Sequence, residues 1–325
     1  MKTRHLFPIS LLLLSTSSLA SELQVTQTAN SGEAKVTTNA MFIEQLSQAR
    51  TFDLSHSWDE NSPIAAVNPS YSMSLNSSHA TTRNTFNDAG QLSFSSEIMQ
   101  FSGHHGGPTI DALGHIGRDG LLYGGVDAIK ASADKRGLGR SGVGAELAID
   151  HYPVDLLTNR GVLLDVARFI NGDSSPLAKG FDITAAHLEQ TAKAQGTTIN
   201  RGDTVFIRTG WGRYFSENSQ LYTADEAAGV GVSGAQYLID IGARVVGNDT
   251  LTFEKRPPIA SSPTFQVFPV HMMLLADNGI YMIENLNLEQ LATAQQYEFV
   301  AVVPPLKIRG ATGSPLRVFA LATKH

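Results

Sequence analysis

The sequence predicts an α/β fold that forms one compact domain over residues 21–325. Two observations support this. Short runs rich in β-branched residues are bounded by Gly, Asp, Asn or Pro, as buried strands are, and segments with helical periodicity lie between them. There is no internal repeat and no Rossmann glycine motif. The predicted strands are RGVLLDVARF, DTVFIRTGW, ARVVGNDTL, GIYMIENL, YEFVAVVPPLKI and RVFALAT.

The clearest helix is predicted in ITAAHLEQTAKAQG. Thr184 is a plausible N-cap, Leu188 and Ala192 share one apolar stripe with Ala185, and Gly196 ends the segment. A second helix is predicted in SGAQYLIDIG, with its N-cap at Ser233, and a third in NLEQLATA. Near the N-terminus, a short amphipathic helix is expected to turn four residues inward: Ala40, Phe42, Ile43 and Leu46.

Residues 1–20 have the pattern of a secretory signal peptide. Basic residues precede an apolar run that is too short to cross a bilayer, and small residues then lead to a cleavage site after Ala20. The chain contains no Cys, so it forms no disulfides. We therefore expect a periplasmic or secreted protein, with an unprocessed membrane tether as the alternative.

The composition limits the class of partner. With 24 basic and 30 acidic residues, the formal net charge is -6, which argues against nucleic acid and anionic membranes because both require a basic surface. A small-molecule substrate is the expected partner. The Ser- and Asn-rich residues 57–95 are expected to form a long excursion or flap over the core.

The stretch HHGGPTIDALGH, residues 104–115, concentrates three histidines and an aspartate. We interpret it as a strand end that passes through a turn into a helix beginning at Asp111, which would place Asp111 and His115 on one face. Imidazole and carboxylate together suit Zn²⁺, Mn²⁺ or Fe²⁺. The alternative is structural: a solvated turn at His104 and His105, a helix cap at Asp111 and a hydrogen-bonded core histidine at His115.

Two downstream residues favour chemistry. His271 follows a strand-like apolar run in FPVH, and Glu284 ends the buried run GIYMIE. A lone carboxylate at the end of a buried strand is costly unless it is paired or coordinated, although a surface Glu at a strand-to-helix junction remains possible. His56, in TFDLSHSW, is expected to be exposed. Trp58 and Phe101 are candidates for ring-stacking walls, with ordinary core positions as the alternative.

With these residues placed, the chain resembles the cyclase family of metal-dependent hydrolases, whose members include bacterial kynurenine formamidase and isatin hydrolase. The resemblance spans residues 51 to 321 and rests on ordered blocks that include FDLSH, VVGNDT, FPVH and PPLKIRGATGSPLRVFAL. It implies a swivelling β/β/α fold, a divalent transition metal (Zn or Mn) and a homodimer or homotetramer.

The family signature, His-x-Gly-Thr-His-x-Asp-x-x-x-His, is laid on this sequence from His105 to His115. The resemblance makes His105 and Asp111 metal ligands, and His115 a second-metal ligand or general acid/base. It makes His271 and Glu284 the residues that complete the metal site or move protons.

Thr109 stands where the family has its second metal-binding His, and Pro108 replaces a Thr. A hydroxyl is a poor ligand for such metals. Either His104 replaces the missing ring, or a shifted site uses His105, Asp111 and His115 with help from His271 and Glu284, or metal binding is lost.

The resemblance implies hydrolysis of an amide or cyclic amide of a small aromatic molecule, as in arylformamidase and tryptophan catabolism. His115, His271 and Glu284 are the expected catalytic residues. The alternatives are an exported binding protein that has lost catalysis, a lyase, and a lactone or isatin-type hydrolase. Export makes kynurenine chemistry less expected, since that pathway is normally cytoplasmic. In the tail block, Lys307, Arg309 and Arg317 serve structure or a subunit interface, or one of them binds a substrate carboxylate.

Overall fold

The computed structural model describes residues 41–322, except 42, 84, 86–91, 105 and 262–263. Arg50–Ala322 form one compact unit, and the described residues before Arg50 belong to a separate one. The predicted signal peptide lies outside the described residues, so its cleavage site and the domain start at residue 21 remain predictions.

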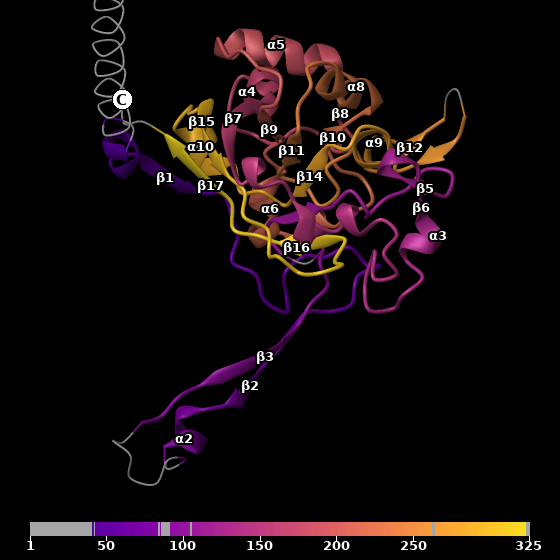
Figure 1. Cartoon of the computed structure of the whole chain (residues 1–325). Coiled ribbons are helices and arrows are strands. Elements are labelled where there is room, and N and C mark those ends of the chain that lie inside the picture. Colours follow the sequence, from indigo (N-terminus) through magenta and orange to yellow (C-terminus); the bar gives the residue numbers. More distant parts are fainter. Residues whose placement is uncertain are drawn as a thin grey trace, which may run out of the picture. The chain divides into compact units, whose positions relative to one another are not determined.

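A nine-stranded mixed sheet forms the centre of the unit (Figure 1). Its four middle strands, β7, β9, β11 and β14, are parallel to one another, and the outer strands are antiparallel to their neighbours. All six strands predicted from the sequence are present, and the α/β prediction is confirmed. In sheet order, the strands are β1 (Arg50–Asp53), β17 (Phe319–Ala322), β15 (Glu298–Val302), β7 (Thr158–Asp165), β9 (Thr204–Arg208), β11 (Val245–Asn248), β14 (Tyr281–Glu284), β4 (Thr109–Asp111) and β16 (Gly313–Pro315).

The longest helices lie together against the parallel strands (Figure 1). Helix α5 (Ala185–Gln195) begins at the predicted N-cap Thr184 and ends at Gly196, which is left-handed with φ +67. Helix α8 (Val232–Asp240) packs beside it but begins two residues earlier than predicted. Its N-cap is Gly231, so the predicted cap at Ser233 was wrong; the Ser233 hydroxyl instead accepts a hydrogen bond from the backbone of Ala185. The predicted third helix is α10 (Glu289–Thr293), and α4 (Val166–Asn171) follows β7.

Shorter elements connect this frame. Strand β2, within the predicted excursion of residues 57–95, pairs with β3, which directly follows it, in a separate two-stranded ribbon that extends from the rest of the unit (Figure 1). The remaining described elements are β2 (Ser72–Ser77), α2 (His79–Thr82), β3 (Ser96–Gln100), β5 (Leu121–Leu122), η1 (Tyr123–Gly125), β6 (Val126–Asp127), α3 (Ala128–Ala131), η2 (Ala145–Leu147), η3 (Ile149–His151), η4 (Val154–Leu156), β8 (Asp182–Ile183), η5 (Trp211–Arg213), α6 (Tyr214–Glu217), α7 (Ser219–Tyr222), β10 (Gly229–Val230), β12 (Ile259–Ala260), β13 (Gln266–Val267), α9 (Pro269–His271) and the π-helical η6 (Met272–Asp277).

Three local predictions were wrong. Asp111 is the last residue of strand β4, and a turn rather than a helix carries the chain to His115, whose N–H donates to the Ala112 carbonyl. Antiparallel pairing on both sides of β4 explains the difference, because it outweighs local helical preference. The run before His271 is helical rather than extended. Pro269 opens α9, and proline is tolerated there because a backbone N–H in the first turn has no partner within the helix. In the N-terminal segment, residues 43–47 are helical, but Ile43 and Leu46 are exposed.

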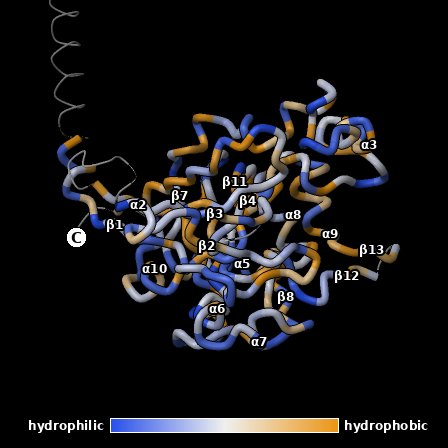
Figure 2. The backbone as a smooth tube through the Cα atoms, turned by 90° about the horizontal axis from the view of Figure 1, so that it is seen from below, coloured by the Kyte–Doolittle hydropathy of each residue, from blue (hydrophilic) through white to orange (hydrophobic). Residues whose placement is uncertain are grey.

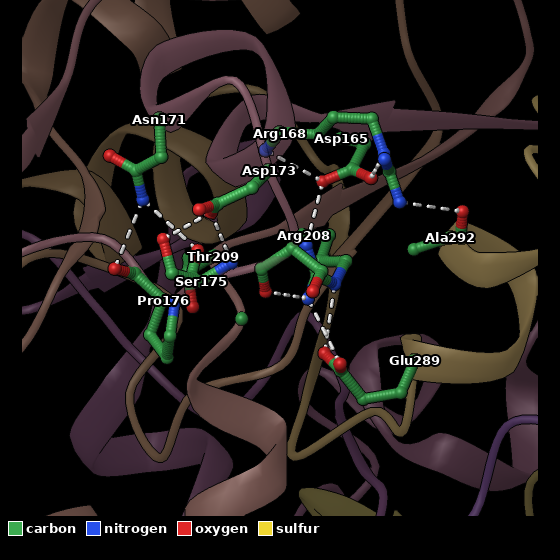
Figure 3. Close-up of polar contacts among 12 residues, drawn as sticks. Asp165, Arg168, Asn171, Asp173, Ser175, Pro176, Arg208, Thr209, Glu289 and Ala292 are labelled. Atoms are coloured by element: carbon green, nitrogen blue, oxygen red, sulfur yellow. Dashed lines mark hydrogen bonds and ion pairs between the residues drawn. The ribbon is translucent and has the colours of Figure 1, made fainter.

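Buried charges hold the carboxyl ends of β7 and β9 together (Figure 3). Arg208, with no exposed surface, donates to Asp165 at 2.9 Å and to both oxygens of Glu289 at 2.8 and 2.9 Å. It also donates to the Ser174 carbonyl. Arg168 makes a second contact with Asp165 at 3.3 Å. Each of these charges therefore has a partner of opposite sign, as buried charges require.

Hydrophobic stretches along the chain are short and alternate with hydrophilic ones (Figure 2). Within the described residues, no helix combines the length and apolar character needed to span a membrane.

Candidate metal centre

One face of strands β14, β4 and β16 forms the floor of the candidate site. Pairing sets Thr109 opposite Glu284 and Asp111 opposite Met282, with Gly313 of β16 on the other side of Asp111. Because side chains alternate along a strand, Thr109, Asp111 and Glu284 point to the same side of the sheet. The alternation of side chains along one strand can be predicted from the sequence, but only the folded sheet places β4 beside β14.

Asp111 is the centre of the cluster. It is 2 % exposed, and its Oδ1 lies 3.0 Å from Nδ1 of His104. The His115 ring lies against the His104 ring, with 3.9 Å between centroids. The second oxygen, Oδ2, is buried and has no hydrogen-bond partner among the described residues. A buried carboxylate oxygen without a partner is costly, so this atom is suited to a cation.

His271 completes the cluster from α9. Its Nε2 lies 3.3 Å from Oε1 of Glu284 and 3.9 Å from Oδ2 of Asp111. On the other side of the ring, Nδ1 is hydrogen bonded to buried Glu254, which also accepts the backbone N–H groups of Val270 and His271. In the neutral ring, a proton on Nδ1 that is shared with Glu254 would leave the lone pair of Nε2 facing Asp111 and Glu284.

Two donor groups within the described residues are compact enough to hold a metal ion, and they share Asp111. One consists of His104, Asp111 and His115, and the other of Asp111, His271 and Glu284; within each group, the donor atoms lie within 4.8 Å of one another. Imidazole with carboxylate is the donor set that Zn²⁺, Mn²⁺ and Fe²⁺ prefer. Together with the unpartnered Asp111 oxygen, the residues fit a divalent transition metal.

Burial and neighbouring charges shift the pKa values of His104, Asp111 and His115. Burial lowers the pKa of His115 to about 4, so its ring is neutral near pH 7. Burial also acts to lower the pKa of His104, but the hydrogen bond and charge of Asp111 outweigh it and the net pKa is raised. Burial works to raise the pKa of Asp111, and the adjacent histidines overcome it, which lowers the pKa to about 2.

On the His271 side of the cluster, the pKa values of both His271 and Glu284 are raised. Burial alone would lower the pKa of His271, but its hydrogen bonds to Glu254 and Glu284 raise it to about 10. Burial raises the pKa of Glu284 to about 7, with His271 opposing the change. The cluster without metal thus holds a proton on His271 and a carboxyl group that titrates near neutral pH. Such opposed shifts are typical of functional sites.

A pocket of about 120 Å³ opens over these groups. His104, Asp111, His115, His271 and Glu284 line it together with residues from four connecting segments: Ala65, Val67, Asn68, Leu251, Thr252, Phe268 and Asn285. The residues from Ala65 to Asn68 belong to the Ser- and Asn-rich excursion, which therefore reaches the rim of the site. Phe268 adopts a left-handed φ of 54 and sets its ring edge-on to His271, with 5.1 Å between centroids.

The departure from the family signature has a visible structural result. Thr109 is fully buried, and its hydroxyl has no hydrogen-bond partner among the described residues. His105, predicted as a ligand, lies outside the described residues. His104 occupies the place beside Asp111, with its Nε2 3.3 Å from the Thr312 hydroxyl. His104 is therefore close enough to act with Asp111 and His115 on one ion, and its replacement of the missing ring stays a prediction.

Other candidate residues lie away from this pocket. Trp58 packs on Tyr71 and Phe101, and neither Trp58 nor Phe101 lines it. His56 is partly buried and stacked on Phe215, so the expectation that it is exposed was wrong. In the tail block, Arg317 forms an exposed ion pair with Asp53, and Lys307 and Arg309 are exposed outside the pocket.

Sequence reasoning missed two supporting residues. Glu254 lies in a loop seventeen residues before His271, and no spacing rule connects the two. Gly313 leaves room for the His104 ring, because a Cβ there would lie 2.5 Å from the ring carbon Cε1. The only available signal was the run GATGSP, whose small residues allow close approach.

Comparison with known proteins agrees with this architecture. The family model described as a putative cyclase matches residues 52–255. Isatin hydrolase from Roseibium aggregatum is 27% identical over 152 residues, which are 44% of this chain and 53% of that protein. The chain thus aligns with about half the length of this curated relative.

Solved structures show the same fold. A crystal structure described as a novel cyclase superposes with a TM-score of 0.70 and 26% identity, covering 84% of this chain and 88% of the other. Isatin hydrolase A from Labrenzia aggregata, bound to benzyl benzoate, gives a TM-score of 0.65 at 20% identity, with 88% and 100% covered. The family match alone includes more than half of the 325 residues, and the chain belongs to the cyclase family.

Proposed function

We propose that this protein is a metal-dependent hydrolase that opens the amide bond of a small aromatic molecule, with a cyclic amide of the isatin type as the best-supported substrate class. The observation that carries the proposal is Asp111. Its buried, unpartnered oxygen faces His271, and the residue belongs to both donor groups of the pocket. Membership of the cyclase family and the similarity to isatin hydrolase support the same reaction class.

Five residues would hold the metal: His104, Asp111, His115, His271 and Glu284. When bound, a divalent ion would supply Lewis-acid polarisation of the substrate carbonyl and lower the pKa of water in the pocket. Glu254 would keep the His271 ring in one orientation, because its carboxylate holds both Nδ1 and the backbone N–H of that residue.

Proton transfer is best assigned to Glu284. In the metal-free protein burial raises the pKa of Glu284 to about 7, so a Glu284 carboxylate that is not bound to the metal would accept a proton and return it to a leaving nitrogen near neutral pH. His115 suits this role less well, since a pKa of about 4 leaves little of its imidazolium form at pH 7.

The volume of this pocket limits the size of the group that can enter it. Its volume of about 120 Å³ corresponds to roughly four water molecules, so a carbonyl group and its nearest atoms fit while the body of the substrate lies toward the rim. Ala65, Val67 and Leu251 supply apolar surface there. A planar aromatic lactam or N-formyl aniline matches this division, and a kynurenine-type formamide is the second substrate to test.

The test is a hydrolysis screen of the metal-loaded chain with isatin, an N-formyl aromatic amine and an aryl lactone. We expect turnover of isatin that chelation abolishes and added Zn²⁺ or Mn²⁺ restores. Glu284→Gln should lower kcat by about 10²-fold or more, as the loss of a proton-transfer group does, with the Tm retained. Full activity in the chelated chain, or in Glu284→Gln, would contradict the proposal.

Thr109 supports a second candidate function, that of a small-molecule binding protein without catalysis. The buried hydroxyl with no partner marks the position of the absent family ligand. If wild type binds isatin without turnover, and Thr109→His gains both metal affinity and hydrolysis, the binding function is the correct one.

We also propose that the protein is exported. Sequencing the N-terminus of the mature chain tests this, because cleavage after Ala20 would leave Ser21 as the first residue.

A further inference from the structure

A second pocket lies at the opposite end of the parallel strands from the metal centre. It is formed where the chain enters β9, β11 and β14, and its volume is about 450 Å³. Tyr281, at the start of β14, lines this pocket, whereas Glu284, at the end of β14, lines the first. The two residues are three positions apart on a strand, or roughly 10 Å. The pockets share no lining residue.

The pocket is cationic in a chain whose net charge is negative. Arg201 and Arg244 line it, and none of its lining residues is acidic. Arg244 forms an ion pair with Asp155 through Nη1. Arg201 makes no ion pair or hydrogen bond with any described residue, and its side chain lies over Gly242, where a Cβ would come within 2.9 Å of its Nη1. One guanidinium therefore remains available for an anion.

A buried phenol adds a directed donor. Tyr281 is 5 % exposed, and its hydroxyl has no hydrogen-bond partner among the described residues. Tyr281 lines the pocket, and its hydroxyl is not fully enclosed by protein. Burial raises the pKa of Tyr281 to about 12, and Arg244 and Tyr123 are close enough to affect it. The phenol keeps its proton at neutral pH and can donate it to a ligand oxygen.

The remaining wall is apolar. Backbone N–H groups around the pocket are already used, for example those of Gly242, Arg244 and Tyr281, so the side chains supply the free donors. Opposite them, the Tyr123 ring lies over Gly279, where a Cβ would come within 2.5 Å of the ring. Aliphatic residues complete the lining: Leu113, Leu156, Ile239, Ala243 and Ile280.

We propose that this pocket binds a small aromatic carboxylate. Arg201 and the Tyr281 hydroxyl would take the carboxylate oxygens, and the aliphatic wall with Tyr123 would take the ring. One unpaired guanidinium balances a monoanion better than a phosphate dianion, and the volume lies in the range of small-molecule sites. The inference does not depend on the proposed hydrolase activity, since no residue of the metal centre takes part.

The experiment is a ¹⁹F NMR titration of the full chain with 4-fluorobenzoate, after chelation and again with Zn²⁺. The neutral 4-fluorobenzamide tests the need for charge, and competition by inorganic phosphate tests whether charge alone is enough. Arg201→Gln and Tyr281→Phe test the two donors. Arg136→Gln is the matched control, because Arg136 is an exposed arginine paired with Asp134 outside the pocket.

We expect benzoate to bind at least about tenfold more tightly than benzamide, the effect of a charged hydrogen bond, with the same affinity with and without Zn²⁺. Arg201→Gln should weaken binding about tenfold and Tyr281→Phe by several-fold, while Arg136→Gln has no effect. Both pocket variants should keep the wild-type Tm.

Four results would overturn the inference: no benzoate binding, equal binding of benzamide, phosphate competing as well as benzoate, or benzoate binding that survives both pocket substitutions. Binding that requires Zn²⁺ and disappears in His271→Gln would assign the carboxylate to the metal centre instead. Because these measurements involve no turnover, their failure is separate from failure of the proposed hydrolase.

Discussion

Metal binding at the Asp111–His271–Glu284 group should depend steeply on pH. His271 has a pKa of about 10 without metal, because Glu254 and Glu284 favour its charged form more strongly than burial opposes it. A metal ion needs the neutral imidazole. At pH 7 the ring must therefore lose a proton three pH units below its pKa, which costs about 4 kcal/mol at 1.36 kcal/mol per unit.

The pKa of His271 also sets the direction of the pH dependence of metal affinity and the pH range over which it is observed. Between about pH 7.5 and 9.5 Glu284 is already ionised, so one proton leaves His271 for each metal bound, and affinity rises about tenfold per pH unit. In the other donor group, Asp111 and His115, with pKa values of about 2 and 4, are deprotonated throughout this window, and only His104, whose pKa Asp111 raises, still has a proton to lose as the pH rises. Affinity through that group should change much less.

The assay is isothermal titration calorimetry with Zn²⁺ held by a competing chelator, repeated in two buffers of different ionisation enthalpy to count released protons. We expect about one proton per metal at pH 8 in wild type and about one fewer in His271→Gln. An affinity that stays flat from pH 7.5 to 9.5, or the same proton count in both chains, would refute the assignment of His271 as a ligand that carries a proton in the metal-free protein.

Three further predictions test residues around the centre. Glu254→Gln should lower kcat by about tenfold or more and shift the pH profile, because His271 loses its charged partner, while Glu254→Asp should recover part of the activity; steady-state kinetics measures both. Gly313→Ala should weaken metal binding through His104, because the new Cβ would lie 2.5 Å from the ring, and calorimetry measures the loss. Arg208→Met should lower the free energy of unfolding by about 3–5 kcal/mol, the effect of leaving a buried carboxylate unpaired, as measured by urea denaturation.

Each of these has a matched control and a contradicting result. Glu298→Gln, an exposed carboxylate paired with Arg160, should change neither kcat nor the pH profile. Gly172→Ala adds a Cβ where no atom lies within 4 Å, so metal affinity should be unchanged despite its left-handed φ. Wild-type pH behaviour in Glu254→Gln, wild-type affinity in Gly313→Ala, or a change below about 1 kcal/mol in Arg208→Met would each contradict the corresponding argument.

Local patterns were enough for the regular elements. The apolar runs that became β7, β9, β11 and β14 read as strands because both faces of a central parallel sheet are buried. Helix α5 could be bounded from Thr184 and Gly196, since caps depend on backbone groups within a few residues. The helix expected at Asp111 failed for the opposite reason: pairing of β4 with β14 and β16 is a long-range effect that residues 104–115 do not encode alone.

By itself, the sequence determined the α/β class, the family resemblance and the residue types able to hold a metal. Tertiary structure decided which of them meet. It brought Asp111 beside His271 and Glu284 across some 160 residues of chain, supplied Glu254 behind His271 and placed His104 beside Asp111. The physical reason is that metal ligation and pKa shifts depend on distances of a few ångströms between side chains, and only the packed sheet fixes those distances.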